Sequence, residues 1–210
     1  MTSQVLSRRA AIAILSLALG CGVGGPRPAW EVPPPAPVEN TIVRMDDLHR
    51  VTLANGAKLI LLEDHRLPRL ALGLTLRRGV GSVDPKVAGV AELATEVMQR
   101  GAGERDALML AKVVEDAGAS LSVSSGWDTT TISLSGLSED RELLLEILAD
   151  VALRPRFDES EFEKALAEQQ ASLVAAQDDP ATLIRWHTLR TLFEGHRYGL
   201  PNSGTSETLA

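Results

Sequence analysis

The most distinctive candidates for a functional site in this sequence are two glutamates four residues apart, Glu92 and Glu96. They lie in the stretch 89–101, where apolar residues recur at the three- and four-residue spacing of a helix. Side chains four apart leave the same face of a helix, so both carboxylates and the neighbouring Thr95 would share one surface. Like charges at this spacing repel unless water or a cation separates them. The pair is therefore either a solvated helix face or, together with Glu168, a carboxylate site for a hard cation.

The elements that would position these residues can be predicted from patterns on both sides of the helix. Asn55-Gly56 between two apolar runs predicts a hairpin with strands over 51–53 and 58–62. Residues 70–76 alternate in polarity like a half-buried strand. Further elements follow in blocks: a helix over 104–117, strands over 120–124 and 129–135, and three helices that end at Gly195. Because these blocks are not strict βαβ units, we expect an α+β fold, a two-layer sandwich of a mixed or antiparallel sheet packed by helices.

Apolar spacing and capping residues also predict helix faces and helix ends. The helix over 104–117 would bury one stripe, made of Leu108, Ala111, Val114 and Ala117. The second of the three later helices would bury another, made of Phe162, Leu166 and Leu173. Asp158 and Glu161 have the spacing of a capping box, and Asp179 precedes a proline at a first helical position. Gly101 and Gly118 are placed to close the two helices before them.

The order of these motifs resembles the N-terminal domain of the pitrilysin/insulinase family of zinc peptidases, which includes mitochondrial processing peptidase. The resemblance extends from Thr41 to the end of the chain. The segments that carry it are the Asn-Gly hairpin, Arg78–Ser82, the helix over 89–101, Asp178–Ala181, Gly195–Pro201 and Gly204-Thr205. The resemblance implies that the domain is one half of a peptidase chamber, faced by a second half across the substrate. A chain that stops at Ala210 would lack the closing strands and that second half.

The resemblance also implies where a zinc site would lie. The family uses two histidines of an H-x-x-E-H motif and a downstream glutamate as zinc ligands, and the motif glutamate activates water. In this sequence the motif is written Glu92-Leu93-Ala94-Thr95-Glu96. The two histidine positions thus fall on Glu92 and Glu96, and the position of the base falls on Thr95. The third ligand would fall at Ala171 or Ser172, with Glu168 one turn earlier.

The donor types at these positions do not suit zinc hydrolysis. Zinc prefers imidazole and thiolate ligands, whereas a site of carboxylates alone suits calcium, magnesium or manganese. Thr95 cannot take a proton from water at neutral pH, and a positioned base is worth about 10²–10⁴-fold in rate. The four histidines, His49, His65, His187 and His196, share no ligand spacing. We therefore expect a domain without catalytic residues or bound zinc, which has kept the peptidase fold and lost the ability to hydrolyse peptides.

Three functions are compatible with this pattern. The first is a non-catalytic subunit that binds peptide or forms a scaffold with an active pitrilysin-type zinc metallopeptidase. The second is an active metalloendopeptidase with an atypical carboxylate site made of Glu92, Glu96 and Glu168. The third is an envelope lipoprotein with an unrelated binding role. Zinc content separates the second from the first, and co-purification with a peptidase separates the first from the third.

Composition excludes one class of partner. The 210 residues carry a formal net charge of -7, and nucleic-acid binding requires a basic face, so no nucleic-acid partner is expected. Hydrophobic residues make up 44% and aromatic residues 3%, so the core must be built from Leu, Val and Ala. The sequence can therefore fill the core of one domain, which we place at residues 41–210.

The N-terminus has the pattern of an export signal. Arg8-Arg9 precede an apolar run over 10–19 that ends at Gly20-Cys21, and this is too short for a membrane span. The pattern resembles a bacterial lipoprotein signal over residues 1–21, in which Cys21 is lipidated, although simple signal cleavage or an inner-membrane anchor would share its features. The Pro- and Gly-rich stretch 22–40 would be an extended tether. We expect an exported protein of the bacterial cell envelope, lipid-anchored and facing the periplasm.

Overall fold

The computed structural model describes residues 47–210, and the chain divides into two units after Glu63. The signal segment, Cys21 and the tether lie outside the described residues. In the first unit, β1 (Leu48–Thr52) and β2 (Lys58–Leu62) form an antiparallel hairpin. Gly56 in the turn has φ +83°, a conformation that favours glycine, in agreement with the Asn-Gly signal. No helix within residues 47–210 is both long and apolar enough to cross a membrane.

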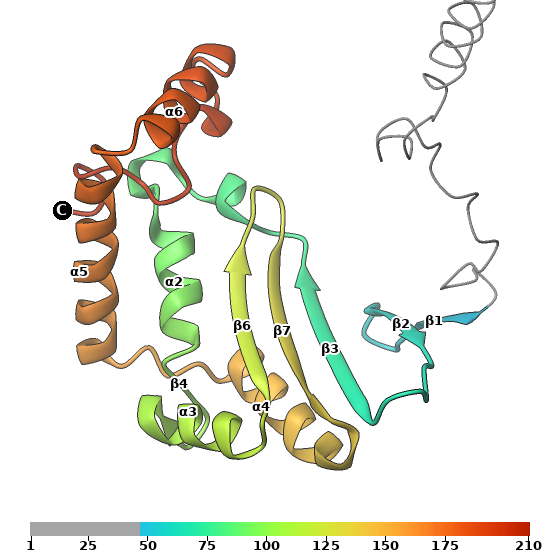
Figure 1. Ribbon diagram of the computed structural model, residues 1–210. Coiled ribbons are helices and arrows are strands. Elements are labelled where there is room, and N and C mark those ends of the chain that lie inside the picture. The colour runs from blue at the N-terminus through green and yellow to red at the C-terminus, as the bar shows by residue number, and fades with distance from the viewer. Residues whose placement is uncertain (1–46) are drawn as a thin grey trace, which may run out of the picture. The chain divides into compact units, whose positions relative to one another are not determined.

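A three-stranded antiparallel sheet organises the second unit (Figure 1). Its order is β3 (Arg69–Leu76), β7 (Thr130–Leu137) and β6 (Ser120–Ser125). The register brings apolar side chains together on one face, namely Leu72, Leu134 and Leu121 in one row and Leu74, Ile132 and Val123 in the next. The alternate positions place small and hydroxyl side chains on the other face, including Gly73, Ser133, Ser122, Thr75, Thr131 and Ser124. One face of the sheet is therefore built for the core and the other for water.

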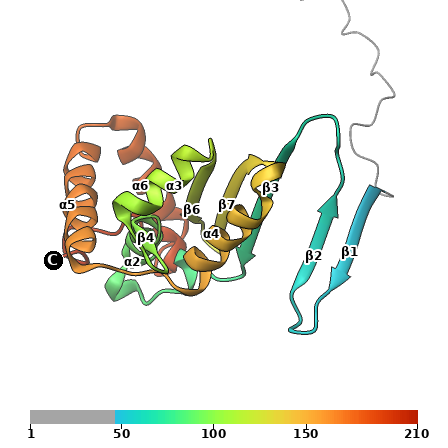
Figure 2. The ribbon, with the colours of Figure 1, turned by 90° about the horizontal axis from the view of Figure 1, so that it is seen from below.

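Two helices cover the apolar face. α4 (Arg141–Leu153) packs against β7 and β3, and α3 (Ala107–Asp116) packs against β6. Figure 2 shows both helices alongside the sheet. The short hairpin of β4 (Gly101–Ala102) and β5 (Arg105–Asp106) precedes α3. The main core contains the buried residues Ala102, Leu110, Val123, Ile132, Leu134, Leu144, Ile147 and Val151.

Three more helices complete the second unit. α2 (Val90–Met98) lies between β6 and α5 (Glu159–Ala176) (Figure 1). Leu93 and Val97 of α2 and Ala165 of α5 form a second buried cluster. α6 (Pro180–Leu192) begins at Asp179, whose carboxylate accepts hydrogen bonds from two backbone N–H groups of the first turn, as its sequence pattern predicts. The α+β prediction with an antiparallel sheet packed by helices is confirmed.

Some predicted helix ends are wrong. α2 ends at Met98, and Gly101 lies in β4 with φ +133° instead of closing the helix. α3 begins at Ala107 because the carboxylate of Asp106 caps it by accepting from the N–H of Met109. Short 3-10 turns were not predicted either: they cover Val80–Ser82, Pro85–Val87, Ser138–Asp140 and Arg197–Gly199. α6 stops at Leu192, three residues before Gly195.

Some predicted buried faces are also wrong. Leu108 is 79% exposed, and Leu110 takes the buried position of α3. The helix is apolar around most of its circumference, so spacing alone allowed more than one stripe. In α5, Phe162 is 40% exposed, and Ala165 is buried in its place. The carboxylate of Asp158 pairs with Arg156 and makes no side-chain cap, so the predicted capping box does not form.

Candidate functional site

The start of α2 is fixed by close contacts to distant segments. Gly89 is the N-cap and has φ +97°, and a Cβ there would lie 2.7 Å from the backbone oxygen of Ser203. The side-chain amide of Gln169 in α5 donates to the oxygens of Gly89 at 3.2 Å and Ser203 at 2.8 Å. Gly89 therefore allows the segment around Ser203 to lie directly against the helix that carries Glu92.

The three positions of α2 that correspond to the peptidase motif line one pocket. The cavity has a volume of about 450 Å³ and lies between α2, β6, α6 and the segment before Gly204. Its wall from α2 consists of Glu92, Thr95 and Glu96. The other walls are formed by Val123, Ser124, Ser125, Trp127, Arg185, Trp186, Leu189, Leu200, Pro201, Asn202 and Ser203. The helix face predicted from the spacing thus borders a real cavity.

Thr95 is tied to its own helix. The residue is 6% exposed, and its Oγ1 donates to the backbone oxygen of Glu92 at 2.9 Å. This bond to the preceding turn is a common one for threonine within a helix. The hydroxyl that stands at the position of the family's base is thereby directed at the backbone, away from the task of taking a proton from water.

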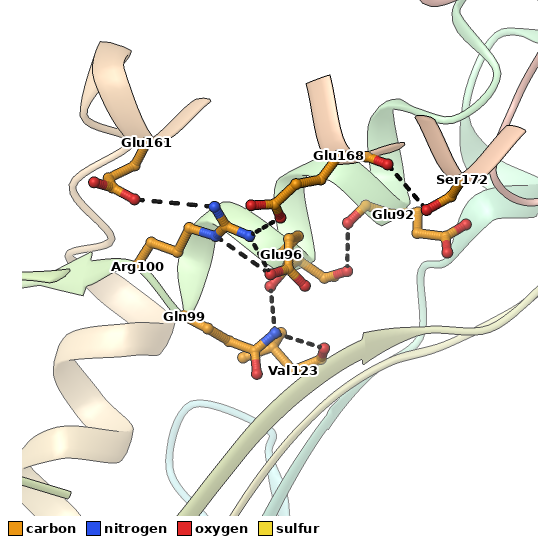
Figure 3. A network of polar contacts seen from close by, with 9 residues as sticks. Glu92, Glu96, Gln99, Arg100, Val123, Glu161, Glu168 and Ser172 are labelled. Atoms are coloured by element: carbon orange, nitrogen blue, oxygen red, sulfur yellow. Dashed lines mark hydrogen bonds and ion pairs between the residues drawn. The ribbon is translucent and has the colours of Figure 1, made fainter. Parts of the chain in front are cut away.

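Arg100 binds two of the three acidic residues that were proposed as metal ligands, Glu96 and Glu168 (Figure 3). Its Nη2 lies 2.8 Å from Glu96 Oε1 and 2.5 Å from Glu168 Oε2, and its Nη1 lies 4.0 Å from Glu161 Oε2. The hydrogen bond from Arg100 lowers the pKa of Glu168, and the bonds to Glu168 and Glu96 raise the pKa of Arg100. The guanidinium supplies the positive charge that a metal ion would otherwise bring to these carboxylates.

The proposed ligands therefore do not fit zinc, nor a hard cation held jointly by Glu92, Glu96 and Glu168. Two of those carboxylates are bridged by a guanidinium, and Ser172 donates to the backbone oxygen of Glu168 at 2.9 Å and is absent from the pocket wall. Within residues 47–210, no three His, Cys, Asp or Glu side chains are grouped as a metal site. His196 accepts a hydrogen bond from the N–H of Tyr198 in a 3-10 turn. The guanidinium of Arg100 lies between the carboxylates of Glu96 and Glu168.

Glu92 differs from Glu96 because no cation neutralises it. Figure 3 shows its carboxylate turned away from Arg100, and it has no hydrogen bond or ion pair within the part of the chain that the structure describes. Partial burial at the pocket wall and then the charge of Glu96 raise the pKa of Glu92. A position in the first turn of a helix favours a negative charge, so burial outweighs the helix dipole here.

We expect Glu92→Gln to stabilise the protein at neutral pH. A carboxyl group whose pKa is raised on folding stabilises the fold fully below its unfolded value of 4.5, and this contribution is lost as the pH rises through the folded value. The variant should therefore gain less than about 1 kcal/mol over the natural protein at pH 8, since the group is solvent-accessible. Urea unfolding at pH 4 and pH 8 measures this. The expectation is contradicted if the variant's gain in the free energy of unfolding over the natural protein is smaller at pH 8 than at pH 4.

The edge of β6 next to the pocket has backbone groups that point away from the sheet. β6 pairs only with β7 among the described strands. The N–H of Gly126 donates to the oxygen of Thr129 at the turn, so these two residues form a hydrogen-bonded pair. In an antiparallel ladder every second pair is hydrogen-bonded, so the next pair, Ser125 with Thr130, is not. The residues of β6 in the pairs without hydrogen bonds direct their N–H and C=O groups outward, and these are Leu121, Val123 and Ser125. One outward carbonyl is in use, because the amide of Gln99 donates to the oxygen of Val123 at 3.4 Å.

Several pocket residues were not found from the sequence. The sequence patterns did not single out Arg185, Trp186 or Asn202, yet all three line the cavity. Asn202 Oδ1 is buried and has no hydrogen-bond partner among the described residues. These residues lie about 100 positions from α2, so only tertiary structure brings them to Glu92. The sequence did contain a signal for the ion pair of Arg100, because Arg100 follows Glu96 by four residues, the spacing at which opposite charges meet on a helix.

The fold and the pocket together define a metallopeptidase-like α+β domain in which the motif helix borders a cavity beside an edge strand. Residues 58–206 match the family described as Insulinase (Peptidase family M16), and the chain belongs to this family. The match runs from β2 through α6 and includes the pocket residues described above, so the resemblance inferred from the ordered motifs is confirmed.

Similar proteins carry differing descriptions. An uncharacterized zinc protease, YmxG of Bacillus subtilis, is 23% identical over 163 residues, which are 78% of this chain and 40% of that protein. A protein described as a non-peptidase homolog, YmxG of Helicobacter pylori, is 26% identical over 157 residues, 74% of this chain and 36% of that one. The crystal structure of a peptidase M16 inactive domain from Pseudomonas fluorescens superposes with a TM-score of 0.73 at 24% identity, covering 78% of this chain and 40% of that chain. This chain thus spans about two fifths of the length of these relatives.

Proposed function

We propose that this chain is a non-catalytic member of the insulinase family that holds extended peptide for an active zinc metallopeptidase partner. The lack of catalysis is supported by Thr95, whose hydroxyl is bonded to Glu92 O, and by Arg100, which bridges Glu96 and Glu168. The relative described as a non-peptidase homolog supports the same view. Since fold does not bring function with it, the proposal rests on these side chains rather than on family membership.

The observation that carries peptide binding is the outward edge of β6. An extended peptide can add a strand to such an edge, where main-chain hydrogen bonds give affinity and neighbouring pockets give specificity. The edge residues Val123 and Ser125 are themselves part of the wall of the 450 Å³ cavity. A peptide bound at this edge would therefore run past the face of α2 that carries Glu92.

We propose a partner because of the chemistry that this site lacks. Within residues 47–210, the positions of the motif offer no base and no set of zinc ligands, so cleavage of a bound peptide requires another site. The resemblance to pitrilysin-type peptidases implies a chamber of two facing halves, and the chain spans about two fifths of the length of the relatives it matches. The missing catalytic groups would be supplied across that chamber.

Peptide binding can be tested with a proline at the edge of β6. Ser125 lies opposite Thr130 in a pair that leaves its N–H free, so Ser125→Pro removes an outward donor without removing a backbone bond to β7. The 3.3 Å contact between the hydroxyls of Ser125 and Thr130 is lost equally in the proline and alanine variants. We expect fluorescence anisotropy to show binding of unstructured labelled peptides by the natural chain and at least about tenfold weaker binding by the proline variant. Ser125→Ala keeps the N–H and is the matched control, which should bind like the natural chain.

Three outcomes would overturn the proposal. Equal peptide affinity of the proline variant and the natural chain would exclude strand addition at β6, provided that circular dichroism shows both folded. Chelator-sensitive cleavage of peptide by the purified chain, with stoichiometric zinc, would establish the active metallopeptidase instead. Purification from its source without any chain that carries an intact H-x-x-E-H motif would favour an envelope lipoprotein with an unrelated role.

A further inference from the structure

We infer that Gln169 of α5 positions the wall of the peptide pocket that residues 200–203 form, and that peptide affinity depends on the two hydrogens of its side-chain amide. Gln169 does not itself line the cavity, so it acts through the backbone that it holds. This inference rests on the proposed binding of peptide along β6 and names a positioning residue for that site.

The side-chain amide of Gln169 joins two segments that are far apart in the sequence. Its Nε2 donates to the oxygen of Ser203 at 2.8 Å and to the oxygen of Gly89, the N-cap of α2, at 3.2 Å. An amide NH2 group has two hydrogens, so each of the two carbonyl oxygens can receive one. The bonds therefore connect the wall before Gly204 to the beginning of the helix whose face forms the opposite wall.

The carbonyl of Ser203 depends on this amide more than the carbonyl of Gly89 does. The oxygen of Gly89 also accepts from the N–H of Leu93 within α2, whereas no other group in residues 47–210 donates to the oxygen of Ser203. A Cβ added at Gly89 would lie 2.7 Å from that oxygen and 3.1 Å from Nε2 of Gln169, so all three groups are in close contact. A partly buried carbonyl that loses its donor is costly, and the Ser203 segment would turn toward water to recover a hydrogen bond.

Residues 200–203 have space on two sides, so packing alone does not fix their place. Leu200 and Pro201 line the 450 Å³ cavity and also a second cavity of about 260 Å³ that α5 and α6 border. Within residues 47–210, the bond from Gln169 is the only hydrogen bond that joins this segment to a helix or strand distant in the sequence. The position of this wall, and with it the width of the peptide pocket, therefore depends on one amide group.

Gln170, the next residue of α5, makes a similar bond that does not involve the pocket. Its Nε2 donates to the oxygen of Leu209 at 2.7 Å, close to the C-terminal end of the chain, which lies beside α5 (Figure 1). Leu209 does not line the 450 Å³ cavity. The two glutamines thus distinguish the positioning of the pocket wall from the general attachment of the C-terminal segment to α5.

The test compares Gln169→Glu with Gln170→Glu in fluorescence anisotropy at pH 8, with an unstructured labelled peptide that carries no charged side chains or ends. Each substitution keeps the shape of the side chain, removes both amide hydrogens and adds one negative charge. We expect Gln169→Glu to bind the peptide about tenfold more weakly than the natural chain, and Gln170→Glu to bind it equally well. Gln169→Lys supplies donors again and should restore the affinity to within about threefold of the natural value.

Gln169→Met lacks the donors without adding a charge, so it serves as a second variant and should lose the same affinity as Gln169→Glu. Thermal melts establish which variants are folded. If folded Gln169→Glu or Gln169→Met binds like the natural chain, if Gln170→Glu loses as much affinity as Gln169→Glu, or if folded Gln169→Lys recovers none, the inference is wrong and peptide binding at β6 stands. If the natural chain itself binds no peptide, the proposed function is wrong.

Discussion

Replacing Asp150 by alanine is expected to destabilise the protein by about 3 kcal/mol. Asp150 is 3% exposed and accepts hydrogen bonds from two arginines: Arg105 Nη1 at 3.0 Å and Arg154 from the end of α4. It joins α4 to the β4–β5 hairpin, since Arg105 lies in β5. Alanine would leave the largely buried guanidinium of Arg105 without this partner and would also leave a cavity. Urea unfolding followed by circular dichroism measures the loss.

Two further variants separate the charge of Asp150 from its shape. Asp150→Asn keeps the volume and part of the hydrogen bonding, so it should lose less stability than the alanine variant. Glu146 binds the same Arg105 at 2.7 Å but its side chain is 55% exposed, and Glu146→Gln should cost less than about 1 kcal/mol because exposed ion pairs contribute little. Equal losses for Glu146→Gln and Asp150→Ala would show that burial of the carboxylate does not matter.

Gly204→Ala is expected to cost about 3 kcal/mol and to weaken peptide binding. Gly204 has φ +78°, and an added Cβ would collide with the backbone of Ala88, whose carbonyl carbon would lie 2.9 Å away. Ala88 directly precedes the N-cap of α2, and its oxygen also accepts a hydrogen bond from Thr208 at 2.8 Å. Because backbone cannot move aside cheaply, the substitution must shift either α2 or the pocket wall before Gly204.

Gly195 provides the matched control for this prediction. It also has a left-handed backbone, with φ +73°, but a Cβ added there would meet no atom within 4 Å. Gly195→Ala should therefore cost only the conformational term, about 1 kcal/mol, and leave peptide affinity unchanged. Thermal unfolding and the anisotropy assay measure both variants. A loss for Gly204→Ala no greater than that for Gly195→Ala would contradict the importance of the contact with Ala88.

The fold could be predicted from the sequence where the signal is local. The turn at Asn55-Gly56 and the cap at Asp179 depend on a few neighbouring residues, and both form as predicted. The buried face of α3 could not be predicted, because Leu108 and Leu110 are both apolar and only packing against the sheet decides between them. Asp158 failed as a cap for a similar reason, since the nearby Arg156 competes for its carboxylate.

The site residues within α2 could be predicted from the sequence, whereas their partners from other elements could not. Spacing alone places Glu92 and Glu96 on one face, and that face lines the pocket. The sequence could not show that Glu168 in α5 would meet Arg100, because 68 residues separate them. It also could not show that Asn202 would line the same cavity as Glu92. Local periodicity predicts which side chains share a surface, but the partners of those side chains depend on how helices and loops pack.

The side-chain amide of Gln99 gives β6 a built-in competitor. It donates to the oxygens of Thr95 at 3.2 Å and Val123 at 3.4 Å, in the middle of the edge that pairs with no described strand. A carbonyl oxygen can accept two hydrogen bonds, so a segment that adds to β6 has either to share this acceptor with Gln99 or to displace the amide. Such a segment makes its full set of main-chain hydrogen bonds only if it also reaches the outward groups of Leu121 and Ser125, so it has to be extended over several residues. The hydrogen bond to this carbonyl also disfavours edge-to-edge pairing of β6 strands from two copies of the chain.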